Sequence, residues 1–236
     1  MNGDHALESL LVPAIFLIGA IGVRFLLHQS VRWWWFAIAV GLQLAHDFLV
    51  SNAFGALPIV IGVDWNWQGK LIVTAFGIML ALAWFGRRET GLISGSKLTT
   101  REFGIFVAIL AIYIAVALYF PGRDTSPERI AYQATMPGIA EETFYRGVLL
   151  YALDRTFAAR CRIAGVELGW GALLVTISFG CAHGLSYTDG TVQFAAFAFA
   201  YTFATGLAFL WFRLRTGSVL VPIALHNCIN LILTLV

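Results

Sequence analysis

The residues best suited to chemistry are two adjacent carboxylates, Glu141 and Glu142, followed by Arg146. They interrupt a stretch that otherwise has the composition of a membrane helix. An ionisable side chain at that depth costs roughly 2.5–3.5 kcal/mol on insertion scales, so it is rare there and usually functional. Glu142 and Arg146 are four positions apart, share a helix face and can form an ion pair. Glu141 points about 100° away and is free for another task, such as general base catalysis.

Two histidines and an asparagine are the next unusual residues in apolar segments. His183 follows Phe179 by four positions, and Asn230 follows His226 by four. A glutamate and a histidine together can bind and deprotonate a water molecule. The imidazole of His226 and the carboxamide of Asn230 can both donate to one oxyanion, an interaction worth about 3–4 kcal/mol of barrier. The alternative is hydrogen bonding between helices, which averages only ~0.6 kcal/mol in membranes but is common.

A metal site uses nearly the same residues. Two histidines with one or two carboxylates form a plausible Zn²⁺ ligand set. The spacing is not diagnostic, because the chain has no HExxH stretch. The residues alone therefore leave both a metal-dependent and a metal-free site open.

Two other features have structural interpretations. His46 and Asp47, late in the second apolar segment, are expected to serve helix packing or to line an entrance. Gly180 and Gly184 form a pattern of small residues that suits close helix packing.

Composition places the chain among polytopic membrane proteins. Of its 236 residues 59% are hydrophobic and 12% are charged, whereas ordinary soluble domains carry about 25% charged residues. The net charge of +2 gives no indication of nucleic-acid binding. We predict an all-α fold, a single transmembrane domain over residues 1–236 built as a bundle of about eight transmembrane helices.

The expected helices follow from the apolar runs, since a span needs ~20 mostly apolar residues. They are Leu10–Leu27, Trp33–Ser51, Lys70–Phe85, Phe103–Phe120, Pro137–Leu153, Gly169–Gly184, Val192–Phe212 and Val219–Val236. The run Phe54–Val63 is too short to cross a bilayer and is expected to be interfacial or re-entrant.

Charge asymmetry orients these helices. The odd-numbered loops hold most of the basic residues, which are Arg32, Arg87, Arg88, Lys97, Arg101, Arg155, Arg160, Arg162, Arg213 and Arg215. By the positive-inside rule, the odd loops face the cytoplasm and both termini lie outside it, in a multi-pass protein of the inner (plasma) membrane. Glu141 and Glu142 then lie about one turn below the outer surface. His183, His226 and Asn230 can meet them in the outer half of the bilayer.

Three motifs in this order resemble the signatures of one family. Glu141-Glu142-Thr-Phe-Tyr-Arg146 matches EExxxR, Phe179-Gly-Cys-Ala-His183 matches FxxxH, and His226-Asn-Cys-Ile-Asn230 matches HxxxN. The chain resembles a CPBP (Abi, CAAX protease and bacteriocin-processing) intramembrane endopeptidase, related to the Ras-converting CAAX endoprotease. The resemblance covers roughly residues 100–236, which are expected to form the catalytic core.

The resemblance implies a role for each residue. Glu141 would be the general base that activates water, assisted by His183. His226 and Asn230 would stabilise the oxyanion, and Glu142 with Arg146 would position the helix and tune Glu141. The family is often labelled metalloprotease, but its glutamic-type mechanism needs no cofactor. We favour the version without zinc, because Asn230 is a natural oxyanion donor and a poor zinc ligand.

The resulting hypothesis is an intramembrane endopeptidase acting on a membrane-anchored protein or peptide, at or near its membrane-embedded C-terminal segment. A site in the outer half of the bilayer favours C-terminal sorting tails of exported proteins. A CAAX-type prenyl-protein peptidase is an alternative with the same chemistry. Two further alternatives are a transporter and a non-catalytic immunity or assembly factor. The lack of an internal repeat argues against the common transporter plan. The expected partners are the lipid bilayer and the protein substrate, and no nucleic acid.

Overall fold

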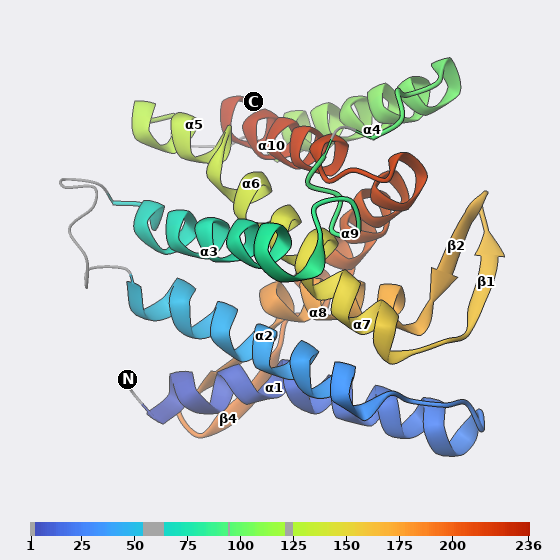
Figure 1. Cartoon of the computed structure of the whole chain (residues 1–236). Helices are drawn as coiled ribbons and strands as arrows, with labels where there is room; N and C mark the ends of the chain where they lie inside the picture. Colours follow the sequence, from blue (N-terminus) through green and yellow to red (C-terminus); the bar gives the residue numbers. More distant parts are fainter. Residues whose placement is uncertain (1–2, 54–63, 94, 121–124) are drawn as a thin grey trace.

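The computed structural model describes residues 3–53, 64–93, 95–120 and 125–236 (Figure 1). The N-terminal half forms four long helices, two of which end in a π-helical stretch. They are α1 (Gly3–Ile21) with η1 (Gly22–Leu26), α2 (Trp33–Ala53), α3 (Trp67–Leu80) with η2 (Ala81–Phe85), and α4 (Thr100–Tyr119).

The C-terminal half forms a short helix, a central helix of three consecutive segments, and three further helices. The helices are α5 (Pro127–Gln133), α6 (Met136–Glu142), η3 (Thr143–Leu149), α7 (Leu150–Thr156), α8 (Trp170–Gly184), α9 (Ala196–Thr216) and α10 (Leu220–Leu235). Two antiparallel hairpins pair β1 (Arg160–Ile163) with β2 (Val166–Gly169) and β3 (Leu185–Thr188) with β4 (Thr191–Phe194).

The prediction of a helical membrane bundle is confirmed. Five helices are long and apolar enough to cross a membrane, and α8 and α10 are shorter apolar helices. The segment expected at Pro137–Leu153 corresponds to α6, η3 and α7, in which every residue from Glu141 to Leu150 is buried. This helix is therefore the centre of the bundle and not a lipid-facing span. The run Phe54–Val63 lies outside the described residues.

The two hairpins and α5 were not expected, and the helix predicted to begin at Val192 begins at Ala196 instead. The reason is local turn chemistry. Asp189 and Gly190 both have positive φ values, 52° and 77°, as the two central residues of a type I′ hairpin turn require. Since this turn directs the chain back into an antiparallel pair, the β-branched Thr191 and Val192 extend a strand before the helix can start.

Helix caps fix the ends that matter for the site. Asn66 begins α3 by accepting a hydrogen bond from Gly69 N at 2.8 Å, and its own amide donates to Val50 O of α2 at 3.0 Å. This ties α3 to α2 and sets the position of Lys70 in the first turn of α3. Thr99 and Glu102 form a reciprocal capping box at the start of α4.

Glycines bring the central helix close to its neighbours. A Cβ on Gly138 of α6 would lie 2.8 Å from Ile223 O of α10, and the Gly138 N–H donates to Asn227 Oδ1 at 2.9 Å. Between α8 and α9, a Cβ on Gly184 would lie 2.6 Å from the Cβ of Phe199, which confirms the packing interpretation of this position. Substitution of either glycine by alanine would push two helices apart.

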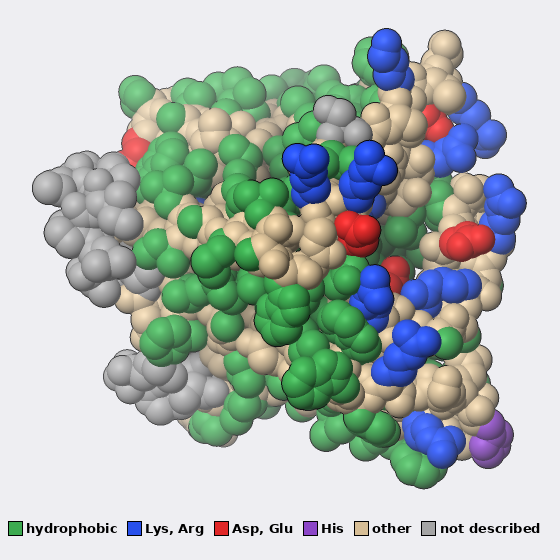
Figure 2. Space-filling model, in the orientation of Figure 1, with side chains coloured by type: hydrophobic (Ala, Val, Ile, Leu, Met, Phe, Trp, Pro, Cys, Tyr) green, Lys and Arg blue, Asp and Glu red, His purple; other side chains and the backbone are tan. Residues whose placement is uncertain are grey.

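The two ends of the bundle differ in charge. Lys and Arg side chains gather on the side of the β1–β2 hairpin (Figure 2). Residues of the odd loops meet there, since Arg155 lies over the Trp35 ring and Arg213 donates to Glu89 O. At the opposite end, Glu128 of α5 accepts hydrogen bonds from the backbone N–H groups of Asp64 and Trp65 at 3.0 and 3.1 Å. The loops are thus sorted between two ends as charge asymmetry predicted, while the assignment of the basic end to the cytoplasm stays a prediction.

Candidate active site

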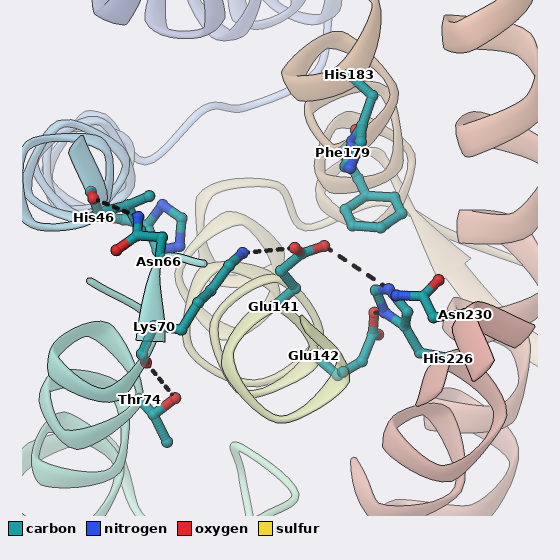
Figure 3. A network of polar contacts seen from close by, with 12 residues as sticks. His46, Asn66, Lys70, Thr74, Glu141, Glu142, Phe179, His183, His226 and Asn230 are labelled. Atoms are coloured by element: carbon teal, nitrogen blue, oxygen red, sulfur yellow. Dashed lines mark hydrogen bonds and ion pairs between the residues drawn. The ribbon is translucent and has the colours of Figure 1, made fainter. Parts of the chain in front are cut away.

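The two carboxylates lie where α6 passes between α3 and α10 (Figure 3). The π-helical segment η3 begins directly after Glu142, and single π-helical turns inside α-helices are frequent at functional sites. Glu142 and Arg146 are completely buried, whereas Glu141 keeps 9% of its surface exposed. Glu141 and Glu142 are therefore adjacent in the sequence but differ in their exposure.

Glu142 forms the buried ion pair expected from its spacing. Its Oε2 lies 3.3 Å from Arg146 Nε, which confirms that prediction. Arg146 also donates from Nη2 to Gly206 O of α9 at 3.1 Å, and its guanidinium carbon lies 4.1 Å from the centre of the Phe179 ring. A buried charge held by one ion pair, one hydrogen bond and the rings of Phe179, Phe209 and Tyr145 has little freedom to move.

His226 is held by Glu142. Its Nδ1 lies 2.9 Å from Glu142 Oε1, and because an ionised carboxylate can only accept, Nδ1 donates. The ring stacks on Phe209 at 4.9 Å between centroids. Nε2 then faces the other carboxylate, at 4.0 Å from Glu141 Oε2. Glu142 thus positions the His226 ring directly, a contact that the sequence motifs did not indicate, and Arg146 holds Glu142 in place.

Glu141 has two unequal oxygens. Oε1 accepts a hydrogen bond from Lys70 Nζ of α3 at 2.6 Å. Oε2 is buried and has no hydrogen-bond partner among the described residues, although His226 Nε2 lies nearby. Lys70 therefore fixes Oε1, and Oε2 can accept a hydrogen bond or a proton from a molecule bound in the site.

His183 and Asn230 lie beside these groups with partners of their own. His183 Nδ1 donates to Phe179 O at 3.0 Å, which leaves Nε2 as the ring's second nitrogen for other contacts. His183 is exposed. Asn230 donates from Nδ2 to Gln133 Oε1 of α5 at 3.1 Å, and its amide carries a second N–H.

One cavity of about 300 Å³ joins the four residues expected to be catalytic. It is lined by Lys70, Tyr132, Gln133, Pro137, Glu141, Phe179, His183, Tyr201, Thr202, Thr205, Phe209, His226, Ile229, Asn230 and Leu233. Glu142 and Arg146 do not line it and lie behind the wall. The cavity therefore holds one carboxylate, two imidazoles, two carboxamides and an ammonium group, which is a set suited to attack on a carbonyl by an activated water.

Lys70 is the important site residue that sequence reasoning missed. The hydropathy pattern marks it only as the first residue of the expected helix Lys70–Phe85. The position of a lysine at the start of an apolar run could have identified it as a site residue, because ionisable residues inside the membrane are functional-site candidates by default. Tyr132 and Gln133 had no such signal, because they belong to α5, which the hydropathy pattern did not predict.

His46 and Asp47 form a separate polar cluster away from this cavity. His46 stacks on Phe144 at 3.9 Å and its Nδ1 lies 3.2 Å from Asp47 Oδ1, while Gln43 donates to the same carboxylate at 3.0 Å. These contacts link α2 to the central helix and agree with the packing interpretation.

Within the part of the chain that the structure describes, no group of three or more His, Cys, Asp and Glu side chains is arranged to hold a metal ion. The metal-free mechanism stays a prediction.

Comparison with known protein families gives a match in the C-terminal half of the chain. Residues 125–232 match the family model described as Type II CAAX prenyl endopeptidase Rce1-like. The matched region includes α5 to most of α10 and contains all three sequence motifs. Comparisons with curated proteins and with solved structures found no significant match.

Proposed function

We propose that the chain is an intramembrane endopeptidase with Glu141 as its general base, and the match of residues 125–232 to the Rce1-like family model supports this. The observation that carries this proposal is the asymmetry of the Glu141 carboxylate. Lys70 holds Oε1, while Oε2 accepts no hydrogen bond from any described residue and lies beside His226, and Glu141 and His226 both line the cavity. A general base must have an acceptor atom directed at the reacting group.

The proposed reaction begins with water in this cavity. Glu141 Oε2 takes a proton from the water as its oxygen attacks the carbonyl carbon of the scissile peptide bond. His183 lines the same cavity, and its Nε2 is available to orient the water because Nδ1 is engaged with Phe179. The electron pair of the C=O bond moves onto the carbonyl oxygen.

The resulting oxyanion needs hydrogen-bond donors. The second N–H of Asn230 is one, and Nε2 of His226 is another when the ring carries both protons. Glu142 accepts from Nδ1 and holds the ring so that Nε2 faces the cavity side. The C–N bond then breaks, and the proton held by Glu141 passes to the leaving amine. Each donor of this kind is worth about 3–4 kcal/mol of barrier.

The position of the cavity bears on the substrate. Lys70 lies in the first turn of α3, at the end of the bundle away from the basic loops. With the basic end in the cytoplasm, the cavity is closer to the outer surface. We therefore propose that the substrates are exported proteins with membrane-embedded C-terminal sorting segments, with CAAX-type prenyl proteins as the alternative.

The test of this function is mass spectrometry of exported membrane proteins from cells with and without the chain. We expect a set of C-terminal tails that is shortened only when the chain is present. The purified chain in liposomes should cut a peptide carrying such a tail, and an added metal chelator should leave that rate unchanged. Identical tails in both cells, together with no cleavage in liposomes, would contradict the proposal.

The orientation has its own test, which uses one native cysteine. Cys161 is exposed in β1 at the basic end, and Thr188 is exposed in β3 at the other end of α8. In intact cells, a maleimide that cannot cross membranes should label Thr188→Cys in a background lacking the native cysteines, and should not label a chain that retains only Cys161. Labelling of Cys161 alone would place the cavity nearer the cytoplasm and favour the CAAX-type alternative.

A further inference from the structure

A second hollow lies at the basic end of the bundle and has no part in the proposed reaction. Its volume is about 590 Å³, and its walls are the start of α4, the end of α9 and the turn between β1 and β2. It shares no lining residue with the active-site cavity. On α9 the active-site cavity is lined by Thr202, Thr205 and Phe209, and the hollow is lined by Trp211 and Arg215, nearer the C-terminal end of the helix.

The hollow is strongly basic. Arg101 of α4, Arg162 of β1 and Arg215 of α9 line it, against a single acidic residue, Glu102. Glu102 is already engaged, since it forms an ion pair with Arg215 and closes the capping box of α4. Across the described residues, Arg101 and Arg162 have no hydrogen bond or ion pair from their side chains. Two guanidinium groups are thus available to one anionic ligand.

The walls are held in place by specific contacts. Trp211 Nε1 donates to Ala164 O at 3.0 Å, which fixes the hairpin turn against α9. Ala164 and Gly165 both have positive φ values, 50° and 79°, so this is a tight two-residue turn. Glu102 accepts from Thr99 N at 2.8 Å and thereby fixes the start of α4. The arginines of the hollow therefore lie on α4, α9 and the β1–β2 hairpin, and these contacts fix the positions of the three elements.

The surroundings specify the chemical class of the ligand. α4 and α9 are both candidate membrane spans, and the hollow lies at the ends of both, which is the level of lipid headgroups. Ile105 and Trp211 give it an apolar side, and Phe103 on α4 is 58% exposed. Guanidinium groups bind phosphate through paired hydrogen bonds, and basic pockets between transmembrane helices suit acidic headgroups. We propose that this hollow binds the phosphate of an anionic phospholipid, with an acyl chain along the apolar face of α4.

The experiment compares two variants that lose the same charge. Arg101→Gln/Arg162→Gln removes the two free arginines of the hollow, and Arg87→Gln/Arg88→Gln removes two exposed arginines outside its lining. The full chain in neutral detergent is titrated with a short-chain phosphatidylglycerol, and its thermal midpoint and binding curve are recorded. We expect the hollow variant to bind roughly 25-fold more weakly, about 5-fold for each arginine, and the control variant to bind as the unchanged chain does.

Three results would overturn the proposal. The first is an equal loss in both variants, which would show a diffuse charge effect. The second is equal binding of a short-chain phosphatidylcholine, which would remove the anionic requirement. The third is full competition by inorganic phosphate at the same concentration, which would indicate a site for a free anion. If the double variant does not fold, Arg162→Gln alone keeps the test, because that side chain lies exposed on the hairpin.

Discussion

Glu141→Gln is expected to lower the rate of peptide cleavage by roughly 10²–10⁴-fold, the usual contribution of a positioned general base. The carboxamide has the shape of the carboxylate, and its oxygen can still accept from Lys70. It cannot take a proton from water at neutral pH. The Lys70 ammonium loses its counter-charge in this variant, so some loss of stability is also expected, and the loss of cleavage should persist under conditions in which the variant is still folded. Cleavage of a labelled tail peptide in liposomes measures it, and the thermal midpoint of the purified chain measures folding.

Glu167→Gln is the matched control for this variant. Glu167 lies exposed in β2, at the basic end and outside the cavity, so the same substitution should leave cleavage unchanged there. Full activity of Glu141→Gln would refute the assignment of the general base. A variant that no longer folds would instead show that the Glu141 charge is structural.

Lys70→Met is expected to lower both activity and stability. The Lys70–Glu141 pair is nearly buried, with 14% and 11% of the two side chains exposed. Removing one partner of a buried ion pair leaves the other charge uncompensated, which costs about 3–5 kcal/mol. Without the ammonium group, the Glu141 carboxylate also loses the contact that fixes Oε1. Lys70→Arg keeps the positive charge and should recover part of both properties.

A double variant separates the two roles of Lys70. In Lys70→Met/Glu141→Gln neither charge remains, so the free energy of unfolding should return toward that of the unchanged chain. Activity should stay absent, because the base is missing. Unfolding in mixed micelles gives the stability and tail cleavage gives the activity, with the exposed Lys97→Met as control. If Lys70→Met alone keeps full cleavage, Lys70 has no part in positioning the base.

Hydropathy was sufficient to predict the long apolar helices, because the energy of burying apolar side chains in lipid dominates the choice of these segments. Trp33–Ser51 and α2 agree at their start, as do Gly169–Gly184 and α8 at their end. The β3–β4 hairpin was missed since an apolar alternation of four residues resembles the first turn of a long apolar helix. α5 was missed because it is short and polar, with Glu128 and Gln133 in its seven residues.

The site was predictable where its contacts are local. Glu142 and Arg146 form their ion pair through spacing along one helix, and helical geometry alone indicates it. Contacts between helices were not predictable in this way. The partner of His226 is Glu142 and that of Glu141 is Lys70, seventy-one positions away, and no periodicity in the sequence relates these residues. Tertiary packing decides which carboxylate meets which cation.

The enclosed central helix also has a consequence for biogenesis. Its segment η3 touches α2, α3, α8 and α9, and the two acids and the arginine that it shares with α6 would partition poorly into lipid without such neighbours. The first of these helices are synthesised before it, and the others only afterwards. During synthesis this segment must therefore stay in contact with protein until α8 and α9 have emerged from the ribosome. The timing of translation, and not hydropathy, then determines when the acidic pair enters the bilayer.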